Sequence, residues 1–241
     1  MNSPQRVVYL SAPEGLPPAE DILRFRLIYD GTLQPSQRDP ENGQEDPIAL
    51  HKQKIRKVFH GQLKRLWHTN QFLTTHKMHP RQKSGEHSPG AGAVIGPNPH
   101  EMILMRDLVP DLYQENGYRF LPLVREEWHL LCELDILFLR RDRPGSVIQA
   151  GDIDNRIKTL IDSLRKPKGA NELIGSEVPE PGEDPFFVLM EDDKQVSSLT
   201  VETDDLLDPI ELPNADNRRA RVVITVNVRP YYVTTLNLSF G

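Results

Sequence analysis

The sequence predicts an α+β fold, with a mixed or antiparallel sheet of four to five strands and helices packed mainly on one face. Hydrophobic side chains alternate along several short segments, which is typical of strands with one buried face. Only two main segments show helical periodicity, so few β-α-β units are expected and such a sheet is favoured. With 21 Pro and 15 Gly in 241 residues, long loops should join these elements.

The first half of the chain contains one predicted strand and one predicted basic helix. Residues 1–20 form a flexible lead-in, and alternating apolar residues then predict a strand over 22–29. Apolar residues at helical spacing predict a long amphipathic helix from Pro47 to about Lys77, with a break near Gly61. After it we expect a flexible insert over 79–100, a short strand over 102–105, and irregular structure up to residue 125.

The second half contains the strongest strand pattern, over 128–139, and a helix that begins near Asp152. An apolar segment over 186–190, a strand from Val196 and a strand over 221–228 follow. These elements predict one domain over 21–229, with inserts at 79–100, 171–184 and 203–217 and a C-terminal arm or extra strand over 230–241.

The charge of the chain is segregated along the sequence. The net charge of −6 is unlike that of most DNA-binding domains, but residues 51–83 hold nine Lys or Arg, five His and no acidic residue. Residues 170–216 hold fourteen Asp or Glu and a single basic residue. Two interpretations remain open: the basic helix binds nucleic acid, or it pairs with the acidic inserts within the chain or across a dimer. The histidines lack nearby Cys or acidic partners, which favours a helical surface over a zinc site.

The single cysteine limits the compartment. Cys132 excludes an intrachain disulfide, indicates a reducing environment, and is expected in the core rather than as a nucleophile. No run of about 20 apolar residues and no apolar leader is present, so we expect no membrane contact and a cytoplasmic protein.

An acidic constellation stands where the second helix begins. In an extended segment residues i and i+2 point to the same side, so Asp152 and Asp154 can converge on one cation. Lys158 lies one helical turn further, and Asp192 or Asp193 can supply a third carboxylate before a strand. Carboxylate oxygens are the ligands that Mg²⁺ prefers. Taken singly, these residues also fit a helix cap, a solvated turn and a surface lysine.

Two segments resemble the RusA family of Holliday junction resolvases: Asp152-Ile-Asp-Asn-Arg-Ile-Lys158-Thr-Leu-Ile-Asp162-Ser-Leu164 and Glu191-Asp192-Asp193-Lys-Gln-Val196. That family shows an acidic pair D-x-D-N, a Lys four residues on, a helix ending in D-(A/S)-L, and a strand entry D-D-x-x-V. The resemblance implies that Asp152, Asp154 and Asp193 are metal ligands and that Asp192 supports them. It also implies that Lys158 stabilises the reacting phosphate and that Asp162 is structural or supports a metal ligand from behind. The present chain departs from the family pattern in its long inserts and its acidic balance.

The resemblance implies a Mg²⁺-dependent endonuclease, with Mn²⁺ as the alternative metal, that cuts branched DNA in recombination and repair. A homodimer is expected, because symmetric cutting of a four-way junction requires two sites related by a two-fold axis. The expected phosphate-binding residues are all basic: Lys52, Lys54, Arg56, Lys57, Lys64, Arg65, Arg140, Arg141 and Arg143. There are two competing hypotheses. The first is a non-catalytic or regulated RusA-fold subunit that binds a protein partner through its acidic inserts or C-terminal arm, in a phage or anti-phage assembly. The second is a nuclease for another structured nucleic acid.

Overall fold

The computed structural model describes residues 23–36, 48–78, 102–140, 152–173, 175–207 and 219–234, together with Asn237 and Phe240. The side chain of Asp152 is outside this set. Several expectations therefore lie outside the described residues: the lead-in over 1–20, the insert over 79–100, most of the insert over 203–217, and the contacts of Arg141 and Arg143.

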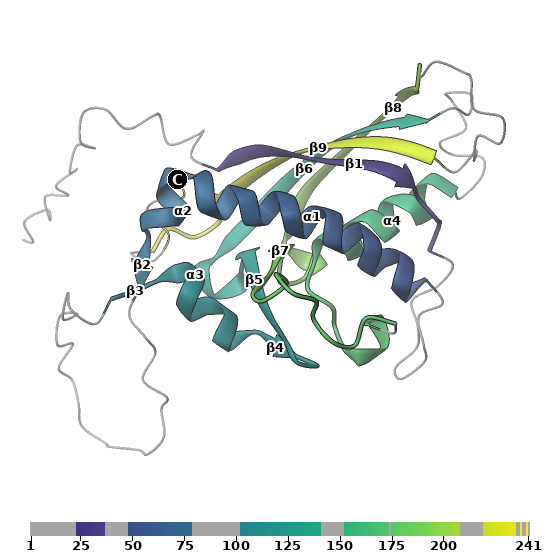
Figure 1. The fold of residues 1–241 in the computed structure, drawn as a ribbon. Coiled ribbons are helices and arrows are strands. Elements are labelled where there is room, and N and C mark those ends of the chain that lie inside the picture. The colour runs from purple at the N-terminus through teal and green to yellow at the C-terminus, as the bar shows by residue number, and fades with distance from the viewer. Residues whose placement is uncertain are drawn as a thin grey trace, which may run out of the picture.

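A four-stranded mixed sheet forms one layer of the molecule (Figure 1). Its strands are β1 (Arg24–Thr32), β6 (Leu130–Arg140), β8 (Val196–Asp205) and β9 (Arg219–Pro230), in the order β1-β9-β6-β8. The pairs β1–β9 and β9–β6 are antiparallel, whereas β6 and β8 run parallel. The strands expected over 22–29, 128–139, 196 onwards and 221–228 are thus confirmed within a few residues, and so is the α+β class.

Two helices pack on one face of this sheet. These are α1 (Ala49–Thr69) and α4 (Asp152–Leu164), and α1 crosses below β1 and β9 in Figure 1. The expected break near Gly61 is wrong, because a helix tolerates an exposed glycine at a cost of about 1 kcal/mol. The helix ends instead at Asn70, whose side chain accepts a hydrogen bond from Leu73 N at 3.0 Å and so caps α2 (Gln71–Thr75).

A second sheet lies on the far side of α1 and was not predicted. It pairs β5 (Tyr118–Val124) in parallel with β7 (Phe186–Met190), and β4 (Gln114–Glu115) precedes β5 in a hairpin. The prediction of irregular structure up to residue 125 is therefore wrong. The sequence of β5 did not indicate a strand because β5 is buried on both faces and shows no polar alternation. The turn Asn116-Gly117, with φ of 48° and 78°, is the hairpin signal in the sequence.

The remaining elements are short: β2 (Lys77–Met78), β3 (Ile103–Leu104), α3 (Met105–Leu108), η3 (Val109–Leu112), η4 (Glu126–Trp128), η5 (Ala170–Glu172) and η6 (Asp193–Gln195). No helix among the described residues is both long and apolar enough to cross a membrane.

The main core fills the space between the four-stranded sheet and the helices. Trp67 of α1 and Trp128 before β6 are fully buried in it. Phe240 packs edge-on against Trp128 with ring centroids 5.4 Å apart, and Asn237 Nδ2 donates to Trp128 O. Of the expected C-terminal arm, the structure describes residues 230–234, Asn237 and Phe240. Asn237 and Phe240 are buried, whereas Tyr231, Tyr232 and Val233 are exposed.

Candidate metal and nucleic-acid site

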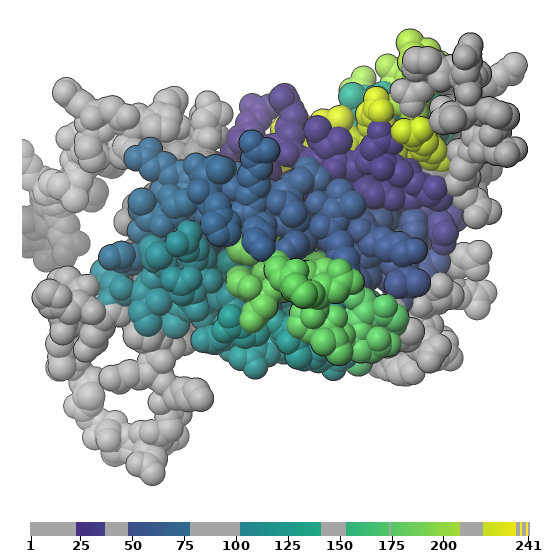
Figure 2. Space-filling model, viewed as in Figure 1, coloured from purple at the N-terminus to yellow at the C-terminus, as the bar shows by residue number. Residues whose placement is uncertain are grey.

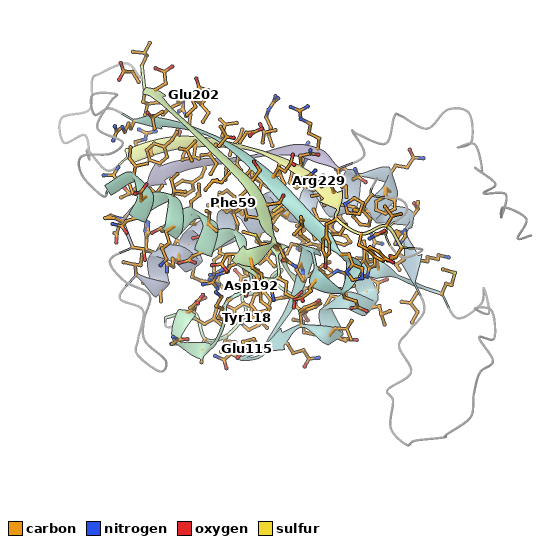
Figure 3. All side chains as sticks on the ribbon, turned by 180° about the vertical axis from the view of Figure 1, so that it is seen from behind. Phe59, Glu115, Tyr118, Asp192, Glu202 and Arg229 are labelled. Carbon is orange, nitrogen blue, oxygen red and sulfur yellow. The ribbon has the colours of Figure 1, made fainter. Side chains whose placement is uncertain are left out.

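One pocket brings the two motif segments together. Its volume is about 660 Å³, and it lies between the first turns of α4 and the start of β8. Five charged residues line it: Asp154, Lys158, Asp162, Asp193 and Lys194. The rest of the wall is mainly apolar and comes from Ile153, Ile157, Ile161, Val196, Leu199 and Val201. Figure 3 labels Asp192, next to Asp193, at the beginning of β8.

The amphipathic pattern of α4 orients the first half of the site. Ile153, Ile157, Leu160 and Leu164 recur at helical spacing and are buried, which fixes the rotation of the helix. Asp154 is then exposed and Lys158 is half-buried, one turn apart along the pocket.

The expected extended geometry for Asp152 and Asp154 is wrong. The helix already includes Asp152, and residues two apart on a helix do not face each other. Of the two aspartates, only Asp154 has a described side chain, and it lies on the same side of α4 as Lys158.

A capping box presents the second half of the site. Asp192 caps η6 by accepting a hydrogen bond from Lys194 N at 3.1 Å, while Gln195 Oε1 accepts from Asp192 N. This turn projects Asp193 toward Lys168, whose Nζ lies 3.3 Å from Asp193 Oδ1 and 3.9 Å from Asp192 Oδ2. The cap therefore holds the Asp192 carboxylate against the backbone of η6.

The electrostatic surroundings favour ionised Asp192. Partial burial opposes its ionisation, but the hydrogen bond from Lys194 N, the side chain of Asp193 and the charges of Lys168 and Lys194 outweigh burial and lower its pKa. Asp192 is thus a carboxylate at neutral pH, which suits both the cap and a site for a cation.

Asp162 anchors α4 from inside. Its carboxylate accepts hydrogen bonds from Lys52 Nζ at 2.7 Å and from Arg165 at 3.1 Å, and its backbone carbonyl accepts a hydrogen bond from Arg56. Arg165 also makes two bonds to Glu172, at 2.9 and 3.0 Å. All five side chains are buried, so this ion network joins α1, α4 and η5 and fixes α4 at the pocket.

The donor set of the pocket fits a hard cation. Within the described part of the chain, no three side chains of His, Cys, Asp or Glu come close enough to hold a metal ion together. Asp154 and Asp193 nevertheless line the same pocket, and Mg²⁺ is commonly held by one or two carboxylates with water and substrate phosphate completing the shell.

The structure corrects three of the predicted DNA contacts. Lys52, Arg56 and Arg140 are 2%, 0% and 3% exposed, so their side chains do not reach a ligand outside the fold. Lys52 and Arg56 face inward because they fall on the same stripe of α1 as Ile55 and Phe59, where buried carboxyl groups balance their charge.

The acidic insert over 171–184 packs on the basic helix and does not loop out. Lys57 pairs with Glu180 at 2.7 Å and with Glu183 at 3.0 Å, and Lys64 Nζ donates to Gly182 O at 2.7 Å. Figure 2 shows this segment, in green, lying directly against α1, in blue. Pairing within the chain thus engages two of the predicted DNA-binding residues, while Lys54 and Arg65 stay exposed on α1.

Two site residues were not predicted. Lys168, just after α4, contacts Asp193, and Lys194 lines the pocket and pairs with Glu126 at 2.8 Å. Lys194 adjoins the Asp192-Asp193 pair in sequence, which is a local signal, whereas the contact of Lys168 depends on the tertiary fold.

No protein-family model, no curated protein and no solved structure matches this chain. The resemblance to the RusA family therefore rests on the two sequence segments that meet at the pocket.

Proposed function

We propose that the protein is a Mg²⁺-dependent endonuclease that hydrolyses phosphodiester bonds in branched DNA, acts as a symmetric homodimer and works in the cytoplasm. The observation that carries this proposal is the shared pocket of Asp154, Lys158 and Asp193. These residues are 35 to 39 positions apart between the two segments, and their convergence is what a metal-dependent phosphoryl-transfer site of the RusA type requires.

Each pocket residue has a separate role in this proposal. Asp154 and Asp193 hold the cation, and Mn²⁺ is a substitute metal. When bound there, the cation neutralises charge on the phosphoryl group and activates water. Lys158 faces the same space and stabilises the negative charge that develops on the scissile phosphate. Asp192 holds η6, and Asp162 holds α4, so both are positioning residues.

The DNA-contacting surface in this proposal differs from the one expected from sequence. Lys158, Lys168 and Lys194 surround the two pocket carboxylates. Lys54 and Arg65 are exposed on α1 and remain candidates for phosphate contacts.

A cleavage assay with several DNA structures tests the proposal. Labelled four-way junction, flap and linear duplex of the same sequence are incubated with the full chain and Mg²⁺ or EDTA. We expect cleavage of the junction in Mg²⁺ at symmetric positions, little cleavage of the duplex, and none in EDTA. Equal cleavage of junction and duplex would contradict the branched substrate, and no cleavage of any DNA in Mg²⁺ or Mn²⁺ would contradict the enzyme.

A second candidate is a regulated nuclease subunit whose partner displaces the acidic insert. The observation that favours it is the pair of carboxylates, Glu180 and Glu183, that neutralise Lys57 on α1. If this candidate holds, Glu180→Gln/Glu183→Gln converts a weak junction nuclease into a stronger one. Unchanged rates in that variant would argue against insert-based control.

A further inference from the structure

Two exposed tyrosines follow β9 and are not explained by the fold. Tyr231 and Tyr232 are 55% and 65% exposed, and Val233 beside them is 61% exposed. Tyrosine is enriched at binding interfaces, because its ring is apolar and its hydroxyl is polar, so two consecutive exposed rings are a candidate binding surface.

The two rings are held in fixed positions. His129 contacts both rings edge to face, with ring centroids 5.3 Å from Tyr231 and 5.5 Å from Tyr232. The Tyr231 hydroxyl is 2.9 Å from His129 Nδ1, and Tyr231 N donates to His129 O, also at 2.9 Å. His129 has a left-handed backbone, with φ of 52°, and Asn237 Nδ2 donates to Tyr232 O at 2.7 Å. Binding at these rings therefore costs little side-chain entropy.

The tyrosines adjoin the candidate metal site. Tyr231 lines a second pocket of about 240 Å³ together with Lys194 and Gln195 of η6. Lys194 also lines the first pocket, beside Asp154 and Asp193. The two pockets thus meet at the turn η6, and a DNA strand that left the first pocket across η6 would meet Tyr231.

Two of the nearby carboxylates are paired with cations. Glu126 pairs with Lys194 at 2.8 Å, and Glu133 pairs with Arg229 at 2.8 Å. These pairs reduce the repulsion that a phosphate backbone would meet on this side of the molecule.

We propose that Tyr231 and Tyr232 form a stacking platform for an unstacked nucleobase next to the scissile phosphate. This inference rests on the proposed function and adds what the site recognises. Every base has a π-face, and an aromatic side chain accepts it without regard to sequence. In a linear duplex the base faces are covered by their neighbours, whereas a branch point exposes them. The platform would therefore select branched or single-stranded DNA over duplex.

The test measures binding without cleavage. A single strand and a four-way junction carry 2-aminopurine at the branch or at the centre, and the full chain is titrated in EDTA. We expect the wild type to quench the 2-aminopurine fluorescence. Because stacking on one aromatic side chain changes affinity about 5- to 150-fold, Tyr231→Leu and Tyr232→Leu should each weaken binding within that range and relieve the quenching.

Matched variants separate stacking from other effects. Tyr231→Phe and Tyr232→Phe keep the ring and should bind within about 3-fold of wild type, given the usual scatter of single-contact effects. Val233→Ser changes the same exposed patch without touching an aromatic ring and should leave binding unchanged. Equal melting temperatures show that the leucine variants are folded.

The outcomes distinguish this inference from the proposed function. Leucine variants that bind and quench like the wild type, in a protein that cleaves junctions, would overturn the platform alone. Ring-dependent quenching in a protein that cleaves no DNA would support the platform and overturn the nuclease. A wild type that binds none of the DNAs, or a loss of binding in Val233→Ser as large as that in the leucine variants, would overturn the platform in favour of a protein-binding patch.

Discussion

Replacement of Lys52 by methionine tests whether the basic helix is partly structural. Lys52 Nζ lies 2.7 Å from Asp162 Oδ2, and the two side chains are 2% and 4% exposed. Lys52→Met keeps most of the aliphatic stem and removes the charge. Removal of one partner from a buried ion pair costs about 3–5 kcal/mol, because the remaining charge is left uncompensated.

The structure indicates the lower end of that range. Arg165 contacts Asp162 at 3.1 Å and is not changed by the substitution, so we expect the carboxylate to keep one cation. We therefore expect a loss of about 3 kcal/mol in the free energy of unfolding, equivalent to a melting temperature about 6–12 °C lower in a chain of this size.

Urea denaturation followed by tryptophan fluorescence measures the change, because Trp67 and Trp128 are buried in the main core. Lys54→Met is the matched control: Lys54 is exposed two residues further along α1, and its loss should change stability by less than about 0.5 kcal/mol. Equal stability of the two variants, with weaker DNA binding in Lys52→Met only, would refute a structural role for Lys52.

Three further predictions follow from single groups. Burial, with a smaller contribution from Glu133, raises the pKa of Cys132 to about 12, so a thiol reagent at pH 8 should label the protein only after unfolding; labelling of the native protein at the rate of free cysteine would contradict the burial. Burial lowers the pKa of His60 below its usual 6.5, so the unfolded chain binds the proton more readily and the free energy of unfolding should fall as the pH drops below about 6.5. Urea denaturation at pH 7.5 and 5.5 should show a smaller pH dependence of stability in His60→Gln, and the same pH dependence as in the wild type would argue against this role of His60. Glu180→Gln/Glu183→Gln releases Lys57 from its two carboxylates, so junction DNA should bind more tightly and with a salt dependence equivalent to roughly one more phosphate contact. Fluorescence anisotropy between 50 and 200 mM salt measures both effects, and weaker binding would show that the insert itself contacts DNA.

The parts of the site that depend on local patterns could be predicted from the sequence. The buried stripe of α4 gives the rotation of that helix, and with it the common side of Asp154 and Lys158. The Asp192 cap follows from the capping-box spacing of Asp192 and Gln195. A helix and a turn each encode their own geometry over a few residues, so both features can be predicted without knowledge of the rest of the fold.

The parts that depend on tertiary pairing could not be predicted in the same way. A lysine on a helix is normally solvated, and only the meeting of α1 with Asp162 of α4 makes a buried Lys52 stable. The strand β5 was missed because both of its faces are covered, so its sequence shows no alternation. The spacing within α1 carries one signal of this burial: Lys52 and Arg56 share the stripe of Ile55 and Phe59.

The most direct test of the central claim is the rate of four-way junction cleavage by Asp154→Asn in saturating Mg²⁺. Asp204→Asn is the matched control, since Asp204 is exposed at the far end of β8. It lines neither the 660 Å³ pocket nor the 240 Å³ pocket beside Tyr231. Loss of a charged group that acts in the transition state costs at least about 100-fold in rate. We predict that Asp154→Asn loses at least that much while it stays folded and binds the junction, and that Asp204→Asn cleaves like the wild type. Cleavage by Asp154→Asn at the wild-type rate would contradict the account.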